Sequence, residues 1–281
     1  MTEGILGVIA CPMLEDELIY ALGKDEGPKT VTVLDTEYCG SLRRKLEAAG
    51  IGYGTMPYDA FLEDGLERED GRFDVVINMN DLGLHAEPKD LKVFIEEQVE
   101  AFQPHVDVLG IYYGLCGNHG WDLTRWCEER GFKPAFIFRD GDGRICDDCI
   151  GVCVGGGPRY LELEKTYVGM LYATPAIASN WRDFLACGDF AKGLESMNRI
   201  ESLREFGVKT IDDYLRWILE MCEYKYIVQL DNGLGDREDF DRYVEEMSSS
   251  LNLGILQAEP GWTTLQPAED LYRACKRYLG N

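Results

Sequence analysis

A cysteine that lies between glycines directly after an apolar segment is the most chemically informative feature of this sequence. Residues 106–112 are apolar and β-branched, as in a buried strand, and lead into the loop 114–120, which contains Cys116. Glycine in such a loop allows positive φ angles and close approach of the backbone to a ligand. Ligands of open α/β sheets bind at the carboxyl ends of strands. We therefore expect Cys116 to act as a metal or cluster ligand, or as a nucleophile.

Two other cysteines occupy similar junctions. Cys11 follows the apolar segment 4–10, and Cys149 lies in a segment, 146–154, that has the pattern of a helix start. The carboxyl ends of parallel strands share one edge of a sheet, so Cys11, Cys116 and Cys149 are predicted to converge. Three thiolates would bind an iron–sulfur cluster or zinc. The alternative is three unrelated cysteines in the core.

Candidates for a fourth ligand are His85, in the loop 81–88, and Glu17, in the helix-like segment that follows Cys11. His119, three residues after Cys116, is a further candidate. Each has a simpler explanation. A single loop histidine is more often a surface or packing residue. Glu17 could serve merely to stabilise the start of a helix, where the helix dipole favours a negative charge.

Several small or polar residues after the strands are expected to line a cofactor or ligand site. These residues are Gly114, Gly117, Asn118 and Thr174. Ordinary turns explain them nearly as well. The glycine-rich stretch 155–158 lacks the Lys-Ser/Thr pair of a phosphate-binding P-loop, and a plain turn is favoured there.

The spacing of Cys146, Cys149 and Cys153 resembles part of a ferredoxin motif. A zinc site would need a second cysteine pair, and none lies nearby in the sequence. On a helix, Cys149 and Cys153 share a face that Cys146 does not. A role for Cys149 alone is therefore preferred, at a helix N-terminus whose dipole would favour its thiolate.

Strand-like and helix-like segments alternate along the chain, which predicts an α/β fold with a largely parallel, Rossmann-like sheet flanked by helices. The acidic stretch 54–71 is predicted to be an irregular surface excursion. A weak boundary near 155–165 suggests two lobes, residues 1–155 with the cysteine-rich site and residues 156–281 as a second α/β lobe. One continuous domain is nearly as consistent with the pattern.

The composition excludes several classes of partner. Among 281 residues, 51 acidic and 28 basic side chains give a net charge of −23, which repels nucleic acids and anionic membrane surfaces. No apolar stretch approaches the ~20 residues of a membrane span. The first ten residues have the pattern of a strand and not of a secretory leader. We expect a cytoplasmic protein in which ten cysteines need not form disulfides.

Six stretches together resemble the family named domain of unknown function 1638, which is found in methanogens and anaerobic bacteria. The most specific is Tyr-Gly-Leu-Cys-Gly-Asn at residues 113–118. The other stretches are residues 9–18, 84–88, 148–150, Thr174-Pro175 with Trp181, and 230–233. One departure is Ala176, since the family usually continues Thr-Pro with Gly-Trp.

The resemblance implies functional roles for Cys11, Glu17, His85, Cys116 and Cys149, but not for Cys146 or Cys153. It also implies an anaerobic one-carbon context, because family members often occur beside corrinoid-dependent methyltransferases. It implies no particular reaction, and whether the chain is an enzyme stays open.

Three hypotheses follow for the function. The first is a metal or iron–sulfur protein with a three-cysteine site that serves corrinoid-dependent methyl transfer. The second is a non-catalytic protein that binds a corrinoid protein, a methyltransferase or a small metabolite in a cleft between lobes. The third is an enzyme with Cys116 as its nucleophile.

Overall fold

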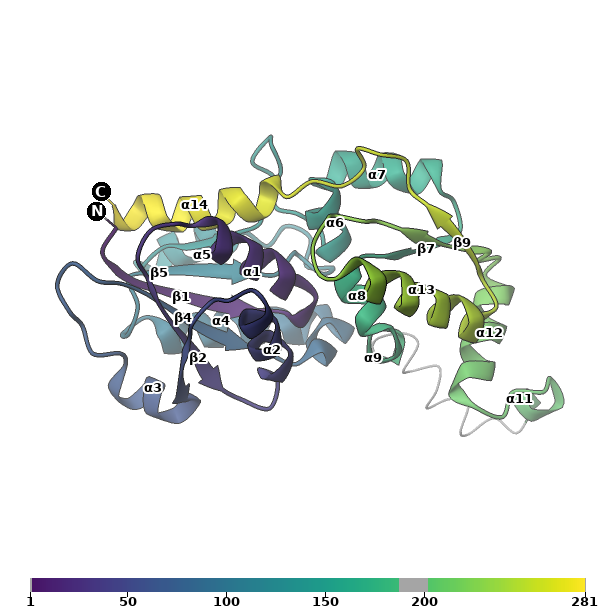
Figure 1. The fold of residues 1–281 in the computed structure, drawn as a ribbon, viewed down its shortest axis with the longest axis horizontal. Coiled ribbons are helices and arrows are strands. Elements are labelled where there is room, and N and C mark those ends of the chain that lie inside the picture. Colours follow the sequence, from purple (N-terminus) through teal and green to yellow (C-terminus); the bar gives the residue numbers. More distant parts are fainter. Residues whose placement is uncertain (1, 187–201, 281) are drawn as a thin grey trace.

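The computed structural model describes residues 2–186 and 202–280, and these residues contain two parallel sheets (Figure 1). In the described chain the first sheet has six strands, in the order β3-β2-β4-β1-β5-β6. The prediction of an α/β fold with a parallel sheet flanked by helices is confirmed. Its strands are β1 (Gly4–Ala10), β2 (Thr30–Asp35), β3 (Gly54–Pro57), β4 (Phe73–Met79), β5 (Val108–Tyr112) and β6 (Ala135–Ile137).

Helices cover both faces of the first sheet. The strands alternate between two apolar clusters: on β1, Ile5 and Ile9 face one cluster, while Leu6, Val8 and Ala10 face the other. Such two-sided burial requires the nearly continuous apolar strands seen in the sequence. The helices on the face of Ile5 are α3 (Tyr58–Asp64), α4 (Pro88–Phe102) and α5 (Leu123–Arg130); those on the other face are α1 (Glu15–Lys24), α2 (Gly40–Ala48) and α14 (Gln266–Leu279).

The second sheet has three described strands in the order β7-β8-β9, and one of its faces packs against helices through a third apolar cluster. Its strands are β7 (Met170–Ala173), β8 (Tyr226–Gln229) and β9 (Gly254–Gln257). The accompanying helices are α7 (Gly157–Thr166), α8 (Pro175–Ser179), α9 (Trp181–Ala186), α11 (Ser202–Glu205), α12 (Ile211–Met221) and α13 (Arg237–Leu251). Every residue of β9 is exposed, so this sheet is less completely covered than the first.

The order of the first sheet creates a crevice at its carboxyl edge. β1 lies between β4 and β5, so the chain moves to opposite sides of β1 at this point. Such a switch in strand order is where open α/β sheets bind ligands. Short 3-10 helices follow two of these strands, namely η1 (Pro12–Leu14) and η2 (Leu82–Ala86), and the loop with Cys116 follows the third.

The stretch 54–71 is more regular than the sequence analysis predicted. It contains the edge strand β3 and the helix α3. Phe61 of α3 is fully buried and contacts Phe102 of α4 in a tilted arrangement, with ring centroids 4.8 Å apart. Tyr58 and Leu62 also pack against the core, so the many acidic residues of this stretch concealed a short apolar face that docks the helix.

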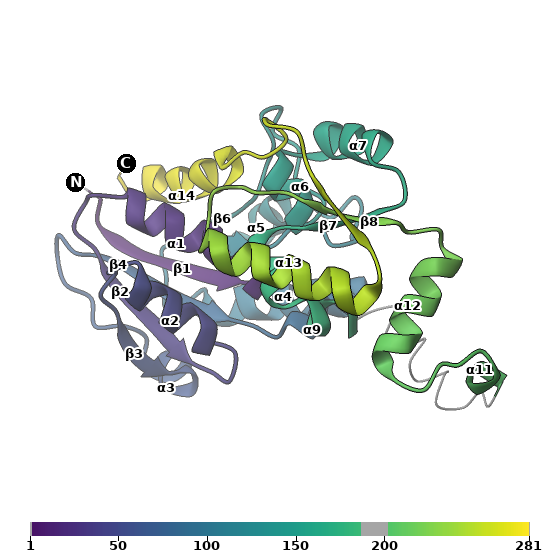
Figure 2. The same ribbon diagram turned by 45° about the vertical axis from the view of Figure 1, so that its right-hand side comes forward.

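The two sheets lie on either side of the predicted boundary at residue 155, but the last helix does not follow that division. α14 returns to the first sheet, where it packs against β1 and β5 and lies beside the start of the chain (Figures 1 and 2). One apolar cluster also continues from Ile5 of β1 to Val228 of β8. The proposed division at residue 155 therefore stays a prediction. In the described chain, no helix combines the length and apolar character needed to cross a membrane.

Candidate functional site: a thiol-lined cavity between the two sheets

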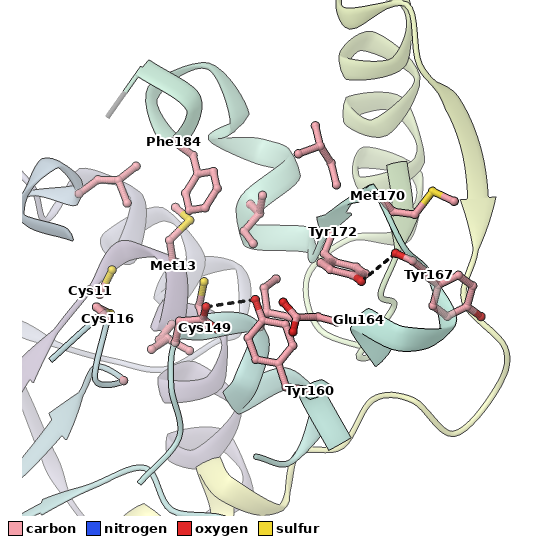
Figure 3. Close-up of a pocket in the computed structure, with 18 of the residues that line it drawn as sticks. Cys11, Met13, Cys116, Cys149, Tyr160, Glu164, Tyr167, Met170, Tyr172 and Phe184 are labelled. Atoms are coloured by element: carbon pink, nitrogen blue, oxygen red, sulfur yellow. Dashed lines mark hydrogen bonds between the residues drawn. The ribbon is translucent and has the colours of Figure 1, made fainter. Parts of the chain in front are cut away.

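A cavity of about 520 Å³ lies at the carboxyl edge of the first sheet, between it and the second sheet (Figure 3). Cys11, Cys116 and Cys149 all line this cavity, as do Gly114 and Gly117. The structure thus brings together the three cysteines that the strand-end argument grouped. They come from three separate parts of the chain, after β1, after β5 and at the start of α6 (Cys149–Val154).

Backbone hydrogen bonds fasten the Cys116 loop to the segment that precedes Cys149. The amide of Leu115 donates to the carbonyl of Cys146 (3.0 Å). The amide of Cys116 donates to the carbonyl of Asp147 (2.6 Å). Gly114 makes this possible, since a Cβ there would lie 2.7 Å from the Cα of Asp148. Cys116 itself has a φ of 45°, which a non-glycine residue adopts at a cost of order 1 kcal/mol. The strained position aims its side chain at the cavity.

Cys11 and Cys149 are fixed in similar ways. The amide of Cys11 donates to the carbonyl of Tyr112, at the end of β5 (3.1 Å), and its carbonyl accepts from Leu14 in the turn into α1 (3.0 Å). Cys149 is the first residue of α6, whose N-cap is Asp148, with its carboxylate accepting from the amide of Gly151 (2.8 Å). Cys11 therefore projects from backbone that is hydrogen-bonded to a neighbouring strand, and Cys149 from the capped first turn of its own helix.

The three thiols are protonated at neutral pH. Burial raises the pKa of Cys11 to about 12, with Glu15 and Glu17 adding to the rise. Burial also raises the pKa of Cys116, and the neighbouring Cys11 adds to it. The pKa of Cys149 is raised by burial, then by Asp148, Cys11 and Cys116. The expected effect of the helix dipole on Cys149 is thus outweighed by desolvation, and an unassisted thiolate nucleophile is disfavoured.

Glu17 is buried on α1 but is not among the residues that line the cavity. Its Oε1 accepts a hydrogen bond from the Nδ2 of Asn232 in the loop after β8 (3.1 Å), while its Oε2 has no partner. Burial and the adjacent Asp16 raise the pKa of Glu17 to about 8. Glu17 therefore connects α1 to the second sheet, beside the cysteines.

The other predicted site residues lie elsewhere. Asn118 donates to the carbonyls of Pro88 (2.7 Å) and Leu115 (3.1 Å), and Thr174 is the N-cap of α8. His119 is exposed, and neither it nor Asn118 or Thr174 lines the cavity. The backbone of His85 belongs to η2, but its side chain lies outside the described part of the structure. Cys187 also lies outside the described residues.

Cys146 and Cys153 are not among the residues that line the cavity. Both are buried, Cys146 in the apolar cluster on the α1 face of the first sheet and Cys153 in the cluster on the α4 face. The two side chains therefore lie in different cores. This arrangement argues against a self-contained cluster built from Cys146, Cys149 and Cys153.

Comparison with protein families identifies the chain. A family model described as a protein of unknown function (DUF1638) matches residues 79–268, more than half of the sequence. The chain belongs to this family. The resemblance found in the sequence motifs is thereby confirmed. No similarity to a curated protein or to a solved structure was detected.

The DUF1638 match includes most of the cavity. It begins at the last residue of β4 and contains Cys116, Cys149 and the side of the cavity formed by the second sheet, whereas Cys11, directly after the first strand, lies before it. No group of three or more histidine, cysteine, aspartate or glutamate side chains in the described part of the DUF1638 protein is arranged to hold a single metal ion.

The aromatic wall of the cavity was not predicted from the sequence. Its aromatic side chains and one carboxylate come from α7, the residue that follows it, β7 and α9 (Figure 3). Its members include Tyr160, Glu164, Tyr167, Tyr172 and Phe184. The sequence did contain one indication of this wall, because Tyr160 and Glu164 are four residues apart and so share a face of a helix. It does not reveal which surface that face meets.

Proposed function

We propose that this DUF1638 protein binds an iron–sulfur cluster or another thiolate-coordinated metal through Cys11, Cys116 and Cys149. The supporting observation is that three thiols from three distant segments line one cavity at a switch in strand order. Packing alone gives no reason for this. Aliphatic side chains would fill the same space at least as well, and glycine would relieve the backbone strain at position 116.

The charges around the thiols favour a cation. None of the described residues that line the cavity is a lysine, arginine or histidine, while Asp148 and Glu164 are among them. A thiolate at this position is unfavourable on its own, because burial and the other thiols oppose it. A bound metal supplies the missing positive charge and would displace the thiol protons, so its affinity rises with pH.

The arrangement favours a cluster over a single zinc ion. The described side chains do not converge on one point, as a tetrahedral ion requires. They are nevertheless close enough for a charge on Cys11 to raise the pKa of Cys116 and of Cys149. A cluster distributes its cysteine ligands over several irons and so accepts a wider spacing. With only three protein ligands, such a cluster would keep one coordination position free for a molecule in the cavity.

The physiological setting remains the one that the resemblance implies, namely corrinoid-dependent one-carbon metabolism in an anaerobe. A cluster would deliver electrons to an inactive corrinoid, while zinc would activate a thiol for methyl transfer as a Lewis acid. The partner would be a corrinoid protein or a methyltransferase. The cytoplasm is the compartment that keeps such free cysteines reduced.

The experiment is anaerobic reconstitution with ferrous iron and sulfide, followed by iron and zinc analysis and visible spectroscopy. We expect iron, sulfide and a broad visible absorption in the wild type, and loss of most of each in Cys116→Ser and Cys149→Ser. Two matched controls, the buried Cys127→Ser and the exposed Cys222→Ser, should retain both. Equal iron in all four variants, or none in the wild type, would refute the proposal.

A second candidate function is favoured by the aromatic wall. The cavity has the size and the mainly apolar lining of a small-molecule site, and it needs no metal to exist. In that case the protein binds a metabolite without metal. A protein that takes up no metal on reconstitution, yet binds a small ligand with an affinity unchanged in Cys116→Ser, would support this candidate over the first.

A further inference from the structure

The aromatic wall of the cavity has a composition of its own. Tyr160 of α7 and Tyr172 of β7 lie edge to face, with ring centroids 6.4 Å apart and an interplanar angle of 76°. Glu164, one turn after Tyr160, also lines the cavity and lies between the two rings in Figure 3. This wall therefore combines two aromatic rings with a carboxylate.

The two tyrosines are held by their hydroxyl groups. The Tyr160 hydroxyl donates to Oδ2 of Asp148 (3.2 Å), and the Tyr172 hydroxyl donates to the backbone carbonyl of Tyr167 (3.1 Å). Both bonds are internal to the protein, and they fix the orientation of the rings. The surfaces that remain for a ligand are the π-systems, whose faces carry partial negative charge.

The charged side chains that line the cavity have one sign. Glu164 and Asp148 line it, and no lysine, arginine or histidine does so among the described residues. An anionic ligand would meet carboxylates without any compensating base. A neutral apolar ligand would gain from the rings but would leave the carboxylates without a role. A cation with an apolar surface satisfies both, because it binds ring faces and carboxylates at once.

We propose that this wall, formed by Tyr160, Glu164 and Tyr172, binds the alkylated head group of a small organic cation, such as a methylated ammonium. The inference rests on the proposed function in placing the ligand in the same cavity, next to the open position of the metal site. It does not require the metal, because the rings and the carboxylate belong to α7 and β7. The cavity, at about 520 Å³, is large enough for a small molecule beside the thiols.

The test is titration of the metal-free, full-length protein with choline and with its uncharged isostere 3,3-dimethyl-1-butanol, followed by calorimetry and NMR. The two probes share a shape and differ in charge. We expect choline to bind about tenfold or more tightly than the isostere, as a cation–π site predicts. Equal affinities, tighter binding of the alcohol, or no binding of choline would overturn the inference.

Variants locate the binding to this wall. Glu164→Gln and Tyr172→Leu should each weaken choline binding by about tenfold. Tyr172→Phe, which keeps the ring, should retain most of it. The matched control is Glu162→Gln, an exposed carboxylate on the same helix that does not line the cavity. A similar loss in Glu162→Gln would indicate general electrostatic attraction by the acidic surface and would contradict the assignment.

The Cys116→Ser variant separates this inference from the proposed function. If that variant loses iron and still binds choline, both proposals stand. If the wild type holds a cluster but does not discriminate choline from the alcohol, the inference is wrong and the metal site is unaffected. If choline binds and no variant or condition yields a cluster, the wall is a binding site and the metal proposal is wrong.

Discussion

The two sheets contribute to the cavity in different ways. The first is a six-stranded sheet with both faces covered, and it holds the thiol-bearing segments by backbone hydrogen bonds to one another. The second has three described strands and an exposed edge strand, and it contributes aromatic side chains. Elements with fewer buried contacts open at lower free energy. We infer that the thiols form the fixed side of the site and the aromatic wall its adjustable side.

The variant expected to have the largest effect on the thiol side of the cavity is Gly114→Ala. The added Cβ would overlap the backbone of Asp148 at 2.7 Å and would separate the Cys116 loop from residues 146–148. We expect a loss of about 5 kcal/mol in the free energy of unfolding, through overpacking and two broken hydrogen bonds. Bound iron should fall to near zero. Denaturant unfolding and iron analysis measure the two effects.

The control for this variant is Gly52→Ala. A Cβ at Gly52 would meet no atom within 4 Å, and its stability should change little. If Gly114→Ala binds iron as the wild type does, the thiol side of the cavity is not fixed by this contact.

Met247→Ala tests the other side of the comparison. Met247 is buried on α13, in the core of the second sheet. Truncation should lower the free energy of unfolding by about 3 kcal/mol. The folded protein should keep its iron and bind choline more weakly, because the mutation loosens the aromatic wall and leaves the thiols in place. A parallel loss of iron would show that the two sides are not independent.

Glu17, which connects α1 to the second sheet, is expected to make the free energy of unfolding depend on pH, by less than the two substitutions above change it. Its pKa rises from 4.5 to about 8 on folding, so folding is favoured by the neutral carboxyl. That contribution is complete below pH 4.5 and is lost as the pH rises through 8. Metal-free Glu17→Gln should therefore gain stability relative to the wild type between pH 5 and pH 6.5, by about 2 kcal/mol.

Denaturant unfolding at the two pH values measures this difference. Glu238→Gln, an exposed carboxylate on α13, serves as the control and should leave the pH dependence unchanged. A Glu17→Gln variant whose stability follows the wild type at both pH values would show that the buried carboxyl does not titrate in this range.

The sequence was sufficient to predict the fixed side of the cavity. Cys11 and Cys116 follow apolar segments, and the geometry of parallel strands places such residues at one edge whatever their separation. The adjustable side could not be predicted. Tyr160 and Tyr172 reach the cavity because of how the second sheet packs on the first, and neither periodicity nor spacing encodes that contact. Cys149 does open a helix, as the sequence indicated, but burial outweighs the dipole of this six-residue helix and raises the pKa of the thiol.

The return of α14 to the first sheet has a practical consequence for handling the molecule. A Cβ added at Gly4 would lie 3.1 Å from Leu279, and the N and C ends lie together at the end of the molecule away from α7 and β7 (Figure 1). Affinity tags or surface anchors attached at either end would leave the mouth of the cavity unobstructed. A short linker could also join the ends, so that new ones could be opened in the exposed turn at residues 141–143 and the backbone circularly permuted.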